Sequence, residues 1–157
     1  MSYLKAMALV LTISLSNAAF SQADEAAVKQ TITNMFDGMR KSDTALLRSA
    51  FAPQAIMQTI SKSRDGKTLV RTEPVDSFIH FVGKPHTEVY DERLVFETVK
   101  VDGDLAIAWT PYKFYLGEKF LHCGVNSFQL VKWNGEWKIQ YIIDTRRRQG
   151  CDSLTGF

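Results

Sequence analysis

His122 is the residue of this sequence whose type best suits proton transfer, because an imidazole titrates near neutral pH and can act as acid, base or hydrogen-bond donor. Three other ionisable residues, Glu92, Lys113 and Arg147, are predicted to lie in one row with it across neighbouring strands. The alternative for His122 is a structural role, paired with a carboxylate or a backbone group. Glu92 and Lys113 could likewise form only an ion pair at the rim of the sheet.

Four further residues are predicted to lie deeper on the same face: Asn126 and Tyr141 as hydrogen-bonding groups, and Phe96 and Trp109 as aromatic walls. Apolar walls with a few placed polar groups are typical of small-molecule sites. The alternative is that Tyr141 and Trp109 belong to the core, and that Asn126 bonds only to water or backbone. Arg147 could clamp an anionic ligand group, since a guanidinium matches carboxylates, or could belong to an exposed basic strand end.

Several function classes are not supported by the sequence. The motifs G-x-S-x-G, H-E-x-x-H, G-x-G-x-x-G and the P-loop are absent, and no pair of carboxylates is clearly placed for glycoside chemistry. His122 and Cys123 are adjacent on a predicted strand, so their side chains point to opposite faces and do not suit a metal site. A net charge of +2 gives no electrostatic case for nucleic acid. We predict no metal, no cofactor and no nucleic-acid partner.

Four long antiparallel strands, joined by tight turns, are predicted to position these residues. Asn134-Gly135 is a strong hairpin signal, because a type I′ turn requires positive φ at both central positions. Asp102-Gly103 and Gly117-Glu118 are predicted to be the two preceding turns, with strands over residues 87–101 and 105–116. Since side chains alternate between the two faces of a strand, these turns determine which residues face inward.

The predicted register places His122 opposite Arg147 and Asn126 opposite Ile143. Asp144 then falls on the outer face, away from His122. That outer face carries small and mildly polar side chains, and it is either an ordinary wet surface or the contact surface of a homodimer. A β-bulge in any strand would exchange the two faces, and long curved strands often carry bulges.

Helices are predicted ahead of the four strands, from apolar residues that recur every three or four positions. The predicted segments are a helix over 24–40 that begins at Asp24, a short helix that begins at Ser42 or Asp43 and that Pro53 ends, a hairpin over 55–62 and 68–72, and a helix over 75–82. Helices grouped ahead of a meander predict an α+β domain, with a curved sheet wrapped on the helices.

The N-terminus has the pattern of a secretory signal peptide. Lys5 precedes an apolar run too short to span a bilayer, and Ser21 and Ala23 are the small residues expected just before a cleavage point. We therefore predict a signal peptide over residues 1–23 and one domain over 24–157, in the periplasm or secreted, with no membrane attachment after cleavage. The alternative is a buried N-terminal helix.

The sequence contains two cysteines, Cys123 and Cys151. An exported protein meets an oxidising compartment, and an even number of cysteines allows one disulfide bond. The alternative is two unpaired thiols, one of them nucleophilic.

The order of the predicted elements resembles the nuclear transport factor 2-like (NTF2-like) superfamily across the whole of residues 24–157. Five segments and Phe128 are similar, more narrowly, to an exported bacterial group labelled putative lumazine-binding proteins; the segments are Val101–Ala106, Tyr112–Tyr115, His122–Gly124, Trp137–Ile139 and Asp144–Arg147. The resemblance implies a cone-shaped fold, with three N-terminal helices packed on a strongly curved antiparallel sheet. It does not imply one reaction, because the superfamily includes ketosteroid isomerase, scytalone dehydratase, limonene epoxide hydrolase, SnoaL-like polyketide cyclases and non-catalytic binding or dimerisation modules.

Three functions follow from these observations. The first is an exported protein that binds a small, partly aromatic or apolar molecule without turnover. The second is a cofactor-independent isomerase, dehydratase or hydrolase with His122 as its catalytic acid or base, and Asn126 and Tyr141 positioning the substrate. The third is a module that homodimerises through the outer face of the sheet. A His122 that points inward with a carboxylate partner would favour the enzyme, whereas aromatic side chains filling the cavity would favour the module.

Overall fold

The computed structural model describes the backbone of residues 2–154 and 156–157, and the side chains of these residues from residue 22 onward. Most of the predicted signal peptide, residues 1–23, lies outside the described side chains. Within the part of the chain that is described, no helix is both long and apolar enough to cross a membrane.

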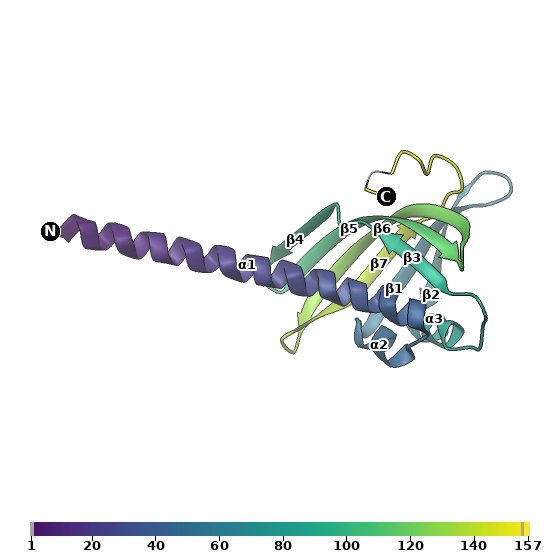
Figure 1. Ribbon diagram of the computed structural model, residues 1–157, viewed down its shortest axis with the longest axis horizontal. Helices are drawn as coiled ribbons and strands as arrows, with labels where there is room; N and C mark the ends of the chain where they lie inside the picture. Colours follow the sequence, from purple (N-terminus) through teal and green to yellow (C-terminus); the bar gives the residue numbers. More distant parts are fainter. Residues whose placement is uncertain (1, 155) are drawn as a thin grey trace.

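Three helices cover one face of a curved sheet. They are α1 (Ser2–Lys41), α2 (Thr44–Ser49) and α3 (Val75–Val82). Figure 1 shows α1 lying across the sheet, with α2 and α3 near its C-terminal end and its first part running beyond the strands. Asp43 caps α2 as predicted, because its carboxylate accepts hydrogen bonds from the backbone N–H groups of Ala45 and Leu46.

The predicted start of the first helix at Asp24 is wrong, since α1 already runs through this position. The Asp24 carboxylate caps no helix. Its Oδ1 instead accepts hydrogen bonds from Lys132 Nζ at 2.7 Å and from Trp137 Nε1 at 2.9 Å. These two hydrogen bonds connect α1 to the hairpin formed by β6 and β7.

Seven strands form one sheet in the order β2-β1-β7-β6-β5-β3, and β4 also pairs with β5. Their bounds are β1 Phe51–Lys62, β2 Thr68–Pro74, β3 Tyr90–Leu94, β4 Thr98–Asp102, β5 Leu105–Leu116, β6 Lys119–Trp133 and β7 Glu136–Thr145. The α+β class and the helix-on-sheet arrangement are confirmed. The sheet is mixed, however, because β1 pairs with β7 in parallel.

Three predicted boundaries differ in the structure. The expected long strand over residues 87–101 is two strands, β3 and β4, separated by residues 95–97. The turn after β4 is formed by Gly103 and Asp104, because Asp102 already pairs with Leu105. Pro53 does not end the second helix, which stops at Ser49, and instead lies within β1.

Two irregularities shift the register of the central strands. The β5–β6 pairing shifts between Phe114 and Tyr115, and the β6–β7 pairing shifts between Gln129 and Leu130. The Gly117-Glu118 and Asn134-Gly135 turns are where the sequence predicted them, but beyond each irregularity all partners move by one residue. Because side chains alternate, a shift of one residue exchanges the inner and outer faces.

The predicted partners of His122 and Asn126 are therefore wrong. Cys123, not His122, bridges Arg147, and Asn126 lies opposite Asp144 in place of Ile143. On β5 the assignment of faces is reversed as well. Its buried residues are Ala106, Ala108, Thr110, Pro111 and Tyr112, whereas Leu105, Ile107 and Trp109 are exposed.

The core lies between α1 and the inner face of the sheet. Val28, Ile32 and Phe36 of α1 are buried in one apolar cluster with Phe128 and Leu130 of β6. Ala106 and Ala108 belong to the same cluster, and their small side chains leave room for the α1 residues. The small residues of β5 therefore face this core cluster, and Leu105, Ile107 and Trp109 face outward.

Candidate functional site

A cavity of about 410 Å³ opens between the helices and the inner face of the sheet. Its volume lies within the range of small-molecule sites. The walls are mainly apolar and include Met35, Phe36 and Met39 of α1 with Phe78 and Phe81 of α3. The polar side chains that line it are Glu73, Glu92, His122, Asn126, Asp144 and Arg146.

Glu92 of β3 contacts Asn126 of β6 across the cavity wall. Asn126 is only 3% exposed, and its Nδ2 donates a hydrogen bond of 2.9 Å to Glu92 Oε1. Burial raises the pKa of Glu92 to about 8, and the charge of Asp144 acts in the same direction against the Asn126 hydrogen bond. At neutral pH this carboxyl group is therefore mostly protonated.

Asp144 is the centre of a second cluster of hydrogen bonds. Its carboxylate accepts from Thr59 Oγ1 at 2.6 Å, from Tyr112 Oη at 3.0 Å and from Arg146 Nε at 2.9 Å. The shifted register of β7 explains this arrangement, because it turns Asp144 to the inner face beside Asn126. A buried carboxylate with three donors is held in one orientation.

His122 lies at the edge of the same cluster. Its Nδ1 is 3.4 Å from Tyr112 Oη, and its ring stacks on Phe114 with 5.0 Å between centroids. Burial lowers the pKa of His122 to about 4, and the positive charge of Arg146 contributes to the shift. The imidazole is thus neutral at pH 7 and reaches the Asp144 carboxylate only through the Tyr112 hydroxyl.

Gly124 allows Tyr112 to occupy its place. The two residues are direct partners in the β5–β6 pairing. A Cβ atom at position 124 would clash with the carbonyl oxygen of Thr145 and lie 2.9 Å from a ring carbon of Tyr112. Only glycine fits there, since the strand backbone and the aromatic ring approach each other so closely.

His122, Asn126 and Glu92 all line the cavity, so the sequence placed these three candidates on the correct face. Trp109 and Lys113 do not line it, which corrects the prediction. Trp109 is 47% exposed on the outer face. Lys113 Nζ lies 5.0 Å from the ring centroid of Phe157, near the C-terminus.

Tyr141, Phe96 and Arg147 also lie outside the cavity lining, contrary to the prediction. Tyr141 Oη donates a hydrogen bond of 2.7 Å to Gln58 Oε1 of the adjacent strand. Phe96 packs against the core in the segment between β3 and β4. The backbone of Arg147 exchanges two hydrogen bonds with Cys123, and this residue extends the β6–β7 ladder.

Four polar residues of the site were missed: Glu73, Tyr112, Asp144 and Arg146. The uninterrupted register predicts Asp144 on the outer face, and the same alternation of side chains puts Tyr112 and Arg146 there as well. Gly124 was the available signal, because a glycine inside a strand marks a bulge or a close approach by another group. The alternation of alanines with Leu105, Ile107 and Trp109 on β5 was a second signal, since small side chains on one face leave room for large side chains packed over them.

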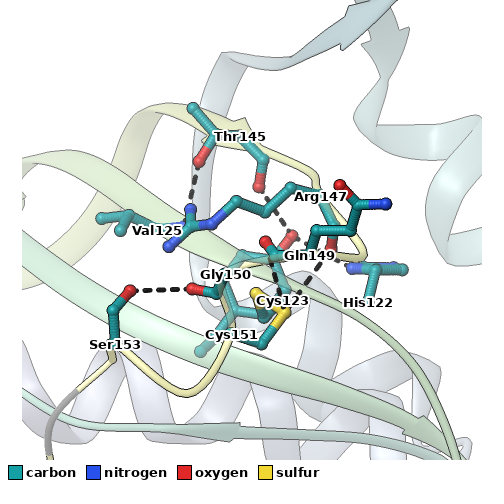
Figure 2. The surroundings of a disulfide bond; sticks show 10 residues. His122, Cys123, Val125, Thr145, Arg147, Gln149, Gly150, Cys151 and Ser153 are labelled. Carbon is teal, nitrogen blue, oxygen red and sulfur yellow. Dashed lines mark hydrogen bonds between the residues drawn. A yellow bond between two sulfur atoms is a disulfide. The ribbon is translucent and has the colours of Figure 1, made fainter.

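The predicted disulfide bond between Cys123 and Cys151 is confirmed. Cys123 is fully buried on β6, and Cys151 lies in the segment after β7. Figure 2 shows the two sulfur atoms joined beside Arg147, with His122 next to Cys123 on the same strand. The bond therefore ties the C-terminal segment to the strand that carries His122.

Solved structures with the same fold come from several bacteria. A protein of unknown function from Pseudomonas putida KT2440 is 17% identical, with 87% of this chain and 96% of that chain covered and a TM-score of 0.64. One from Shewanella baltica OS155 is 18% identical over 81% and 96% of the two chains, with a TM-score of 0.63. A protein from Streptomyces avermitilis, described as a putative dehydratase, is 16% identical over 81% and 98%, also with a TM-score of 0.63.

All three are described as NTF2-like, and at these identities they establish the fold alone. No curated protein matches the chain. A family model described as "Putative lumazine-binding" matches residues 23–141, which is most of the chain. The chain therefore has the fold of NTF2-like proteins and belongs to this putative lumazine-binding family.

Proposed function

We propose that this protein binds a small, partly aromatic or apolar molecule in the cavity between α1, α3 and the sheet. The observation that carries the proposal is an open cavity of about 410 Å³, with apolar walls and hydrogen-bonded polar groups. The family description, which refers to lumazine binding, supports a small-molecule ligand. The aromatic side chains leave this space unfilled, which favours binding over a purely structural module.

We also propose that the protein is exported, with residues 1–23 removed and residues 24–157 forming the mature domain. The disulfide bond supports this, because such bonds persist in oxidising compartments. The contacts of Asp24 with Lys132 and Trp137 support a domain that begins at this residue. The mature protein would reside in the periplasm or outside the cell.

Replacing His122 by alanine tests the binding proposal. We expect the mature protein to gain thermal stability with lumazine or another small heterocycle, and we expect His122→Ala to lose that gain because the variant removes one side of the polar cluster. The melting temperature without ligand should change little, since His122 is half-buried and its hydrogen bond to Tyr112 is long. Differential scanning fluorimetry measures both quantities.

His80→Ala is the matched control, because His80 is exposed on α3 and does not line the cavity. It should retain the ligand-induced shift. A large fall in melting temperature for His122→Ala without ligand would instead make this residue structural, and the binding role would be lost.

A cofactor-independent enzyme is the second candidate function. Its specific support is the chain from His122 through Tyr112 to the Asp144 carboxylate, which gives the histidine an indirect carboxylate partner. A neutral imidazole in a partly apolar site can accept a proton from a bound substrate. The description of the Streptomyces avermitilis relative as a putative dehydratase is compatible with this candidate. Recovery of chemically unchanged ligand after incubation would rule it out for that ligand.

We further propose that two copies associate through the outer face of the sheet. Leu105, Ile107 and Trp109 of β5 are 52%, 43% and 47% exposed, and they lie in a row on that face. An apolar row of this kind is typical of a contact surface.

Light scattering of the mature protein should give the mass of a dimer, and Trp109→Glu should give a monomer. Val89→Glu, at an exposed apolar residue outside the sheet, should remain a dimer.

A further inference from the structure

The charged groups that line the cavity are mainly acidic. Glu73, Glu92 and Asp144 bring three carboxyl groups, and Arg146 brings the one guanidinium in the described lining. That guanidinium is already paired, since Arg146 Nε lies 2.9 Å from Asp144 Oδ2. His122 adds no positive charge at neutral pH, because burial lowers its pKa to about 4.

Glu92 is the acidic group best placed to meet a ligand. Its Oε1 accepts the hydrogen bond from Asn126, whereas none of the described residues donates one to Oε2. Oε2 is not among the buried unpaired atoms of the described structure, so it is accessible from the cavity. No ion pair involves Glu92 among the residues that the structure describes. The carboxyl group thus faces the cavity with one oxygen unused.

The surroundings of Glu92 place no free positive charge beside it. The groups that face it are apolar on α1 and α3, and elsewhere they are Glu73 of β2, Tyr112 of β5, His122 and Asn126 of β6, and Asp144 with its partner Arg146 at the end of β7. A buried carboxyl group in such surroundings keeps its proton until an opposite charge arrives.

The aromatic walls of the cavity also favour a positively charged ligand group. The rings of Tyr90 and Phe114 line it, and Phe81 stacks on Tyr90 at 5.4 Å between centroids. Aromatic faces attract cations, and the polarisable sulfur atoms of Met35 and Met39 pack readily against aromatic rings. An apolar body and one positive charge would both find partners here.

We propose that the ligand is a small aromatic or apolar molecule with a protonated nitrogen, and that this nitrogen pairs with Glu92. The inference rests on the ligand-binding function proposed above and specifies its chemical class. On binding, the Glu92 carboxyl group gives up its proton to the solvent, and the resulting carboxylate pairs with the ligand cation.

Three probes with one ring system and different charges test this inference: 2-naphthylmethylamine, 2-naphthylmethanol and 2-naphthoate. Isothermal titration calorimetry with the mature protein at pH 7 should find that the amine binds about tenfold or more tightly than the alcohol, because a new ion pair replaces a neutral contact. The anion should bind most weakly. The shared ring keeps the apolar contribution constant.

Glu92→Gln should remove the preference for the amine over the alcohol, because glutamine carries no charge and retains an oxygen for the Asn126 hydrogen bond. Glu97→Gln is the control, since Glu97 is exposed and lies outside the cavity lining. Titration in buffers of different ionisation enthalpy adds an independent readout. The unmodified protein should release about one proton on binding the amine, and Glu92→Gln should release none.

The possible outcomes distinguish failure of this inference from failure of the proposed small-molecule binding. Equal binding of the amine and the alcohol, or tightest binding of the anion, would overturn the charge preference and leave small-molecule binding in place. Binding of the amine without proton release would also overturn the role of Glu92. If none of the three probes binds, and no heterocycle raises the melting temperature, both proposals fail.

Discussion

Asp144→Ala should lower the free energy of unfolding by about 3 kcal/mol, which is a large part of the stability of an ordinary domain. Asp144 is 6% exposed and accepts hydrogen bonds from Thr59, Tyr112 and Arg146. Alanine leaves the hydroxyl group of Thr59 without its acceptor, and the Tyr112 hydroxyl keeps only the carbonyl oxygen of Thr145. The Arg146 side chain is half exposed and can turn to solvent, so the loss of this ion pair contributes little. Urea denaturation of the mature protein measures the change.

Two further variants separate the contributions. Thr59→Val removes a single donor and should cost about 1 kcal/mol, the usual value of one hydrogen bond. Asp144→Asn keeps the shape and the acceptor oxygen and should fall between Thr59→Val and Asp144→Ala. If Asp144→Ala unfolds at the same urea concentration as the unmodified protein, this cluster does not stabilise the fold, and a functional reason for the buried carboxylate gains weight.

The fold was predictable because its local signals agree with one another. Val28, Ile32 and Phe36 recur at helical spacing and are buried in the core as predicted. The Asn134-Gly135 turn has positive φ at both residues, which is the conformation that makes this dipeptide a hairpin signal. Such signals depend on a few neighbouring residues, so a single sequence carries them completely.

The register was not predictable to the end of each strand. Counting outward from the Gly117-Glu118 turn is correct for Tyr115 and Phe120, and is wrong by one residue from Phe114 onward. The strands must curve around α1, and a bulge is the usual way to bend a strand. Gly124 indicates a bulge or a close approach on β6 but does not locate the extra residue at Leu121, and no comparable signal stands beside Gln140, since the need for each extra residue comes from packing against a distant helix.

This limit explains which site residues were found. Glu92, His122 and Asn126 were placed on the inner face, and they line the cavity. Tyr112 and Asp144 lie on the far side of a register shift and were assigned to the opposite face. Their hydrogen bond connects strands that are distant in the sequence, and it became visible only in three dimensions.

Loss of the disulfide bond should cost about 3–4 kcal/mol of unfolding free energy, since the bond closes a loop across 28 residues and restricts the unfolded chain. A variant with both Cys123→Ala and Cys151→Ala, compared with the oxidised protein by urea denaturation, measures this cost. The C-terminal segment should also open, because the disulfide joins it to β6. Amide hydrogen exchange after Arg147 should therefore accelerate in the variant and remain slow in the oxidised protein.

Reduced and oxidised samples of the unmodified protein provide the matched control, because they differ only in the bond. The single variant Cys151→Ala separates the cross-link from packing, since Cys123 then keeps its buried place on β6. It should lose nearly as much stability as the double variant. Thiol titration of denatured, unreduced protein purified from the periplasm should find no free cysteine. Two free thiols in that material would mean that the bond does not form in the cell, and the support it gives to export would be withdrawn.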